Sequence, residues 1–204
     1  MTSEPVRDAV SDPLLTPSNS ALVVIDYQPS QIQTVHSMDT DLLIRNIVSV
    51  ARTAKAFGVP IVLSTVNVAN GQGHTVPELA EALSGEVEID RTQINAWEDI
   101  EFRNAVEATG RKNLIMTALW TEVCLTFPSL DALRAGYEVY PVVDAVGGTS
   151  LEAHRTGLER IVQAGAQPIS WVSLACELQR DWGRVATVPE IVDIVLTTRL
   201  LAGV

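Results

Sequence analysis

The sequence has little cysteine, no long apolar run and no recognisable leader segment. Its two cysteines, Cys124 and Cys176, are too few for the disulfide framework of a small secreted domain. No apolar run approaches the roughly 18 residues of a membrane-spanning helix. The first twenty residues contain neither the basic segment nor the apolar core of a signal peptide. We therefore expect a cytoplasmic protein without a membrane segment.

Positive charge is also scarce in this chain. There are 14 Lys and Arg residues against 25 Asp and Glu residues, which gives a net charge of −11. Nucleic acids and anionic membranes bind basic surfaces, so neither is expected as a partner. A small-molecule substrate remains compatible with this composition, because a binding site carries its own local charge.

Common cofactor motifs are absent from the sequence. No G-x-G-x-x-G follows the first apolar run and no Walker A motif occurs, so the glycines of Gly71–Gly73 and Gly147–Gly148 are predicted to lie in ordinary turns. The three histidines lack the close spacing of a metal-ligand motif. They are His36, His74 and His154. We expect no metal and no other cofactor.

Apolar runs of strand length alternate with helical patterns along most of the chain, and 47% hydrophobic residues suffice for one core. The predicted strands are Ala21–Ile25, Val59–Thr65, Glu86–Ile94, Asn113–Leu119, Glu138–Asp144 and Pro168–Leu174. The predicted helices are Leu42–Phe57, Pro77–Leu83, Glu98–Thr109, Glu122–Gly136, Leu151–Ala164 and, with a break near Pro189, a segment that reaches Leu201.

This alternation predicts an α/β fold, namely a single-domain, doubly wound, mainly parallel six-stranded sheet with helices on both faces. The expected strand order is 3-2-1-4-5-6, and residues 20–204 form the domain. Residues 1–19 contain three prolines among polar residues. They are predicted to be an N-terminal arm, either loose in a monomer or lying on a neighbouring subunit.

Cys124 lies just after the fourth predicted strand, where the chain turns into a helix. Thr121 is a plausible N-cap, which places Cys124 in the first helical turn. Unpaired backbone N–H groups and the positive end of the helix dipole then favour the thiolate, as a nucleophile requires. The alternatives are a buried structural cysteine and a pairing with His36 or His74.

Asp26 follows directly after the first predicted strand, which is apolar throughout. Ligands of doubly wound sheets bind at the carboxyl ends of the strands where the strand order reverses. If the first and fourth strands are neighbours, Asp26 and Cys124 emerge side by side at that point. Burial there raises the pKa of a carboxyl group, which can then exchange a proton with the thiol. The alternative is that Asp26 only caps a turn.

Three segments resemble the signature segments of the isochorismatase-like cysteine hydrolases. They are Val24–Gln28 (VIDYQ), Arg91–Trp97 (RTQINAW) and Leu119–Cys124 (LWTEVC). The resemblance covers about residues 20–180, with the segments in the family's order and spacing. The stretches NAWED, LWTEVCLTFPSLDALRAGYEVYPVVDA and ACELQRDW resemble the YcaC-like branch most.

The resemblance implies a triad of Asp26 as general base, Cys124 as nucleophile and Arg91 at the position where the family usually has lysine. Neither of the two lysines can replace it, because Lys55 lies within the first helix and Lys112 lies at the wrong end of the sheet. Arginine can orient Asp26, but it cannot donate a proton as lysine does. The alternative for Arg91 is a surface ion pair with Asp90 or Glu88.

The resemblance also implies a cis peptide bond between Leu119 and Trp120, and an oxyanion hole formed by the backbone N–H groups of Trp120 and Cys124. Further residues are candidates for the lining of the substrate pocket. Trp97 and Trp120 are expected to form an apolar wall of this pocket. These candidates are Gln28, Asn95, Trp97 and Thr149. Each can equally be a core or capping residue.

The predicted function is hydrolysis of a small amide-like C–N substrate through a thioester on Cys124. The resemblance implies a homo-oligomer, with the octamer as the form suggested by the YcaC-like branch. Two alternatives remain. One is a catalytically silent binding or scaffold protein in which Arg91 has disabled the chemistry. The other is a thiol redox sensor in which Cys176 resolves oxidised Cys124.

Overall fold

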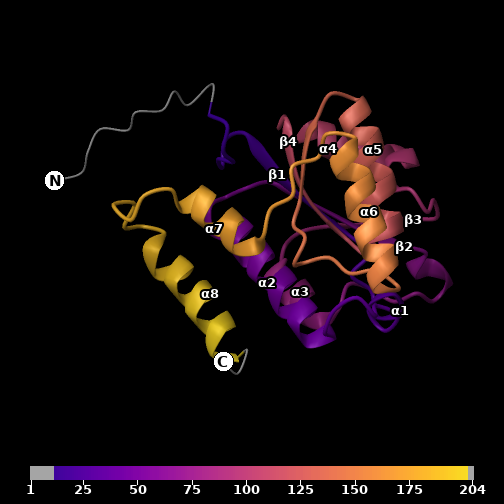
Figure 1. The fold of residues 1–204 in the computed structure, drawn as a ribbon, viewed down its shortest axis with the longest axis horizontal. Coiled ribbons are helices and arrows are strands. Elements are labelled where there is room, and N and C mark those ends of the chain that lie inside the picture. The colour runs from indigo at the N-terminus through magenta and orange to yellow at the C-terminus, as the bar shows by residue number, and fades with distance from the viewer. Residues whose placement is uncertain (1–11, 202–204) are drawn as a thin grey trace.

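The fold is organised around a parallel sheet that Figure 1 shows between two layers of helices. The computed structural model describes residues 12–201, with side chains up to Val195. Within this range the sheet has five strands in the order β3-β2-β1-β4-β5, and every pair is parallel. The strands are β1 Ser20–Ile25, β2 Ile61–Val66, β3 Glu88–Arg91, β4 Asn113–Ala118 and β5 Glu138–Pro141.

Two sets of helices cover the two faces of the sheet, as expected for a doubly wound α/β fold (Figure 1). One face carries α2 Thr40–Ala56, α3 Pro77–Ala82, α7 Trp171–Gln179 and α8 Val188–Leu201. The other carries α4 Ile100–Ala108, α5 Thr126–Arg134 and α6 Leu151–Gln163. The short helix α1, Pro29–Ile32, follows the end of β1. None of the helices in the described range is long and apolar enough to cross a membrane.

The central strand β1 shows why the sheet needs both layers. All six of its residues are buried. Leu22 and Val24 pack into the cluster beneath α2 and α7, whereas Val23 and Ile25 pack into the cluster beneath α4 and α5. Successive side chains of a strand point to opposite faces, so a strand that is apolar at every position must be covered on both. The burial of β1 on both faces confirms its predicted position in the middle of the sheet.

The predicted sixth strand, Pro168–Leu174, is wrong. Ile169 makes only an isolated bridge to Val142, and the helix α7 begins at Trp171. The side chain of Ser170 accepts a hydrogen bond from the Ser173 amide and caps this helix. A short apolar run fits a buried helix as well as a buried strand. Here the Ser170 cap favours the helix.

Two other strands are shorter than predicted. β3 ends at Arg91, and Ile94 beyond it is 64% exposed. β5 ends at Pro141, although the Val142 amide beyond it still donates to the Met116 carbonyl of β4 at 3.1 Å. Both strands lie at the edges of the five-stranded sheet, and backbone hydrogen bonds join the outer side of β5 to residues 167–169.

The predicted N-terminal arm packs against its own chain over its described part. Residues 1–11 lie outside the described residues. From there on, Leu15 is fully buried and its amide donates to Glu177 of α7 at 2.8 Å. Asp12 pairs with Arg180 at 2.9 Å. For residues 12–19 the expectation of a loose arm is therefore wrong.

Candidate active site

The ends of β1 and β4 bring Asp26 and the Cys124 turn to the same edge of the sheet. Ile25 and Ala118 are partners in the register of β1 and β4, and the Leu119 amide donates to the Ile25 carbonyl at 3.1 Å. The strand order reverses between these two strands, so this edge is the position at which doubly wound sheets bind ligands.

Asp26 itself has an unusual backbone conformation. Its φ is +63°, in the left-handed region that residues other than glycine seldom adopt. Its amide donates to the Ser64 carbonyl at 2.9 Å, and its side chain is completely buried. Such conformations cluster at functional sites, where the surrounding structure holds them in place.

Arg91, the last residue of β3, pairs with Asp26 through two parallel hydrogen bonds. The distances from Nη1 to Oδ1 and from Nη2 to Oδ2 are both 2.7 Å, and neither side chain is exposed. Nη1 also donates to the Thr65 carbonyl at 2.9 Å and Nη2 to the Ile94 carbonyl at 3.3 Å. The alternative of a surface ion pair with Asp90 or Glu88 is therefore wrong.

Burial and pairing act in opposite directions on Asp26 and Arg91. Burial raises the pKa of Asp26, and the hydrogen bonds and charge of Arg91 oppose this rise without cancelling it. Burial alone lowers the pKa of Arg91, but the hydrogen bonds and charge of Asp26 more than reverse that effect. A bidentate contact of 2.7 Å is the geometry of an ionised carboxylate facing a guanidinium. The resting pair is therefore a carboxylate held by a cation.

Cys124 lies in the nucleophile turn, the single π-helical turn Thr121–Leu125 that precedes α5. The predicted N-cap is wrong, because Trp120 occupies the cap position and no side chain caps the turn. The Thr121 hydroxyl is instead hydrogen-bonded to Nδ1 of His154 at 2.8 Å. The turn is thus held by another part of the chain rather than by its own cap.

The Cys124 thiol is buried and lies close enough to the Asp26 carboxylate for each group to shift the pKa of the other. Burial raises the pKa of Cys124, and the charge of Asp26 raises it further, while Arg91 and the backbone N–H of Trp120 act in the opposite direction. The expectation that the helix start favours the thiolate is therefore wrong for the resting site. The resting site holds a thiol rather than a thiolate.

The peptide bond between Leu119 and Trp120 is cis, which confirms that prediction. The Trp120 backbone N–H lies near the Cys124 sulfur and acts to lower the pKa of the thiol. The Trp120 indole N–H contacts the Gln31 carbonyl at 3.1 Å and the Thr34 hydroxyl at 2.9 Å. Trp120 thereby links the nucleophile turn to α1 and the residues after it.

Two predicted pocket residues use their polar groups inside the protein. The Gln28 amide donates to the carbonyls of Val66 and Gly73 at 2.9 and 2.7 Å, and accepts from the Val66 amide at 2.9 Å. Asn95 accepts from the Trp97 amide at 3.1 Å and donates to Asp131 at 2.8 Å. These contacts fix the segments that follow β2 and β3.

The other two predicted pocket residues are Trp97 and Thr149, and Trp97 lies apart from Trp120, its predicted partner in the apolar wall. Trp97 packs edge-on against Phe102 and Tyr137, in the cluster beneath α4 and α5, whereas Trp120 packs against the opposite cluster. The two tryptophans therefore do not form one wall. Thr149 is exposed and donates to Glu122 of the nucleophile turn.

The sequence predictions assigned no role to Glu122 and His154, and treated Gly147–Gly148 as ordinary turn glycines. The structure places these residues against the nucleophile turn. Glu122 lies inside the LWTEVC segment, so its place beside Cys124 in the sequence is known. Its hydrogen-bond partner Thr149 is 27 residues further along the chain. Local patterns carry no signal for such a contact.

Several alternative pairings of the site are not formed. Cys176 is exposed on α7, which packs against α2, whereas Cys124 lies in the cluster on the other face of the sheet. Lys55 pairs with Glu86. Among the described residues, no group of three or more His, Cys, Asp or Glu side chains is arranged to hold a metal ion.

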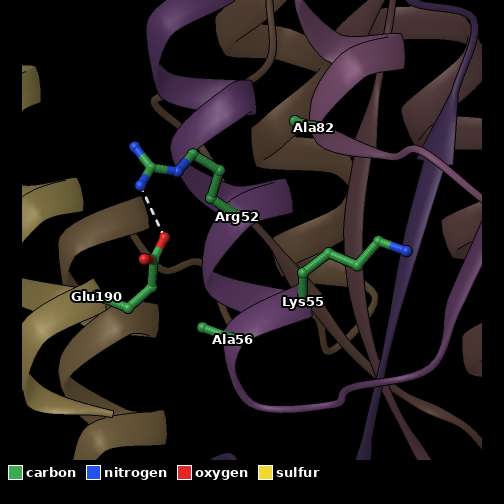
Figure 2. A pocket seen from close by; sticks show the side chains of 5 residues that line it. All are labelled: Arg52, Lys55, Ala56, Ala82 and Glu190. Carbon is green, nitrogen blue, oxygen red and sulfur yellow. Dashed lines mark hydrogen bonds and ion pairs between the residues drawn. The ribbon is translucent and has the colours of Figure 1, made fainter.

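A surface depression lies far from the triad at the opposite edge of the sheet. Figure 2 shows that its lining includes the Arg52–Glu190 pair, with Lys55 directed away from that pair. Arg52 and Lys55 belong to the last turns of α2, which ends near the start of β2. The depression is therefore at the amino ends of the strands, away from Asp26 and Cys124.

Comparison with known proteins identifies the family. The model of the isochorismatase domain matches residues 20–173. The protein named Probable hydrolase YcaC, from Escherichia coli (strain K12), is 36% identical over 169 residues, which cover 82% of this chain and 81% of that protein.

Two solved structures are similar over almost the whole chain. YcaC from Pseudomonas aeruginosa, with hexane-2,5-diol and covalent acrylamide, has a TM-score of 0.86 and 33% identity over 93% of this chain and 96% of that one. The YcaC gene product from Escherichia coli, described as an octameric hydrolase of unknown specificity, has a TM-score of 0.86 and 32% identity over 98% and 97%. The chain therefore belongs to the isochorismatase family of hydrolases.

Proposed function

We propose that this protein is a cysteine hydrolase that cleaves a small amide-like C–N bond. The observation that carries the proposal is the buried Cys124 thiol beside a buried Asp26 carboxylate, which Arg91 orients through two hydrogen bonds. A nucleophile, a base within hydrogen-bond reach and a third group that orients the base are the parts that nucleophilic catalysis requires.

In the first half of the proposed reaction, Asp26 takes the proton from Cys124 as the sulfur attacks the substrate carbonyl carbon. The backbone N–H groups of Trp120 and Cys124 stabilise the resulting oxyanion. The tetrahedral intermediate collapses, the C–N bond breaks, and the protonated Asp26 gives its proton to the leaving nitrogen. The products of this half are an amine and a thioester on Cys124.

In the second half, Asp26 takes a proton from a water molecule that attacks the thioester carbonyl. The C–S bond breaks, the sulfur regains its proton from Asp26, and a carboxylic acid leaves. Arg91 keeps both oxygens of Asp26 oriented and transfers no proton, because a guanidinium stays protonated. Asp26 is then the single acid–base group of the cycle.

A raised pKa of the thiol is compatible with this cycle. The charge of Asp26 contributes to that rise, and Asp26 is also the group that accepts the proton during attack. This arrangement uses a base at the moment of reaction rather than a thiolate at rest. The silent-protein alternative predicts instead that Cys124 forms no covalent intermediate.

The relatives support reactivity and assembly for this chain. The Pseudomonas aeruginosa YcaC structure contains covalent acrylamide. We propose that Cys124 is the corresponding reactive group here. The Escherichia coli YcaC structure is described as octameric, and we propose a homo-oligomer for this chain.

A panel of small amides, anilides, imides and carbamates tests the proposal. At least one compound is expected to be hydrolysed by the unsubstituted protein, and Cys124→Ala is expected to abolish its turnover. Cys176→Ala is the matched control, because Cys176 is exposed and lies on the other face of the sheet. Full turnover by Cys124→Ala would contradict the proposed nucleophile.

A further inference from the structure

Glu122 lies between Trp120 and Cys124 in the sequence, and its side chain is held by the segment before α6. Its Oε1 accepts a hydrogen bond from the Thr149 amide at 3.0 Å and another from the Thr149 hydroxyl at 2.6 Å. Its Oε2 is buried and has no hydrogen-bond partner among the described residues. Thr149 is thus the residue that fixes this carboxylate.

Close backbone contacts bring this segment onto the nucleophile turn. A Cβ atom at Gly148 would lie 2.6 Å from Glu122 Oε2 and 2.9 Å from the His154 amide nitrogen. A Cβ atom at Gly157 would lie 2.9 Å from the Cα atom of Glu122. Real Cβ contacts are almost never that short, so the two glycines permit an approach that other residues prevent.

Further hydrogen bonds join the turn to the same segment. The Thr121 amide donates to the Gly147 carbonyl at 2.9 Å, and the Thr121 hydroxyl is bonded to His154 at 2.8 Å. The Thr126 hydroxyl donates to the Thr121 carbonyl at 2.7 Å. No side chain caps the turn, and these contacts, together with the Glu122–Thr149 pair, join it to the segment before α6 and to α6 itself.

We propose that Glu122, anchored by Thr149, is a positioning residue that keeps the Trp120 and Cys124 amides directed at the developing oxyanion. This inference rests on the proposed function. Glu122 touches no reacting atom in this role, and it takes no proton. Its effect is on the direction of the amides, and misplacing an oxyanion donor lowers the rate of attack on a carbonyl.

Two probes of Cys124 separate this role from general loosening of the fold. Acylation by p-nitrophenyl acetate forms an oxyanion, expels p-nitrophenolate and leaves an acetyl group on the sulfur. Alkylation by iodoacetamide is a displacement at carbon that expels iodide and forms no oxyanion. Peptide mass spectrometry measures both rates at Cys124 and distinguishes them from reaction at the exposed Cys176.

Loss of the anchor is expected to slow acylation only. Glu122→Ala should lower the acylation rate of Cys124 about 10- to 100-fold, the scale of a misplaced oxyanion donor. Thr149→Val, which loses the hydroxyl donor but keeps the amide, should lower it about threefold to tenfold, since one of two hydrogen bonds remains. Iodoacetamide alkylation should stay within about twofold in both variants.

Two controls match these substitutions. Thr149→Ser keeps both donors to Glu122 and should restore the unsubstituted acylation rate within about twofold. Glu159→Ala removes an exposed carboxylate from α6 and should change neither rate.

The outcomes decide between a positioning role and its alternatives. Unchanged acylation in Glu122→Ala, or an equal fall in acylation and alkylation, overturns the positioning role while the proposed hydrolase stands. Failure of the unsubstituted protein to acylate Cys124 overturns the proposed hydrolase, and the positioning role with it.

Discussion

Two arginine–carboxylate pairs in this molecule have the same length and opposite surroundings. Arg91 contacts Asp26 at 2.7 Å, and both side chains are 0% exposed. Arg52 contacts Glu190 at 2.7 Å, and their side chains are 33% and 46% exposed. The first pair lies at the carboxyl ends of the strands, and the second lines the depression in Figure 2.

Two ion pairs of equal length therefore differ in how much they contribute to stability. Water screens the Arg52 pair, and such exposed pairs contribute about 0–1 kcal/mol to stability. The Arg91 pair has lost its water, so each charge depends on the other and on the carbonyls around Arg91. Burial also raises the pKa of Asp26 toward the range in which a carboxyl group can exchange protons during catalysis.

The largest effect is expected from removing the negative charge of the buried pair. Asp26→Asn should lower turnover of an accepted amide about 10²- to 10⁴-fold, because the acid–base group is lost. The charge of Asp26 raises the pKa of Cys124 and Arg91 lowers it. The pKa of the thiol should therefore fall in this variant, and the pH dependence of iodoacetamide alkylation at Cys124 measures that fall. Unchanged amide turnover would rule out Asp26 as the base.

Removing the positive charge of the buried pair is expected to act mainly on stability. Arg91→Ala leaves Asp26 buried without its partner and should lower the free energy of unfolding by about 3–5 kcal/mol near neutral pH, as measured by urea denaturation. A loss below about 1 kcal/mol near neutral pH would show that Asp26 does not depend on Arg91.

The same variant has an expected pH dependence. Without Arg91, burial acts on Asp26 unopposed, so the pKa of Asp26 in the folded state lies further above its unfolded value. The neutral carboxyl group then favours the folded state fully below the unfolded pKa, and this contribution disappears as the pH rises through the folded pKa. The stability deficit of Arg91→Ala should thus be smallest in acid. A deficit that grows as the pH falls would contradict this linkage.

Replacing the guanidinium group of Arg91 by a single ammonium group is expected to have a smaller effect. Arg91→Lys keeps the charge but loses the bidentate geometry, so it should cost about 1–2 kcal/mol of stability and change amide turnover by less than about tenfold. Lysine is also the residue implied at this position by the resemblance to the family. Damage equal to that of Arg91→Ala would show that the fork, rather than the charge, is required.

The smallest effect is expected at the exposed pair. Arg52→Ala should lower the free energy of unfolding by no more than about 1 kcal/mol and leave turnover unchanged. A double-mutant cycle with Glu190→Ala measures the coupling of the pair directly. A coupling above about 2 kcal/mol would mean that exposure does not separate the two pairs.

Much of the fold was predictable because its signals are local. The continuous apolar residues of β1 and the alternation of strands and helices predicted a covered parallel sheet, and the structure confirms the order of five strands. The predicted strand Pro168–Leu174 is wrong, since an apolar run of that length fits a strand or a buried helix. The Ser170 cap settles it as a helix only once its hydrogen bond to Ser173 is seen.

The candidate site was predictable in its position but not in its contacts. Strand ends and motif residues predicted that Asp26 and Cys124 lie together, and the structure places the two side chains close enough to shift each other's pKa. The two hydrogen bonds between Arg91 and Asp26 join residues that are 65 positions apart in the sequence, and the Glu122–Thr149 pair joins residues that are 27 positions apart. Gln28, a predicted pocket residue, uses its side-chain amide to hold the chain at the end of β2, and this contact with Val66 spans 38 residues.

The pH dependence of Cys124 acylation tests most directly whether Asp26 activates the thiol. With p-nitrophenyl acetate and mass spectrometric readout, the rate should rise through one ionisation above the ordinary aspartate value of about 3.9 and then stay level to about pH 9. This shape follows because burial raises the pKa of Asp26 and burial, with Asp26, raises that of Cys124. A rate that climbs tenfold per pH unit up to about pH 9 would show an unassisted thiol and contradict the proposed base.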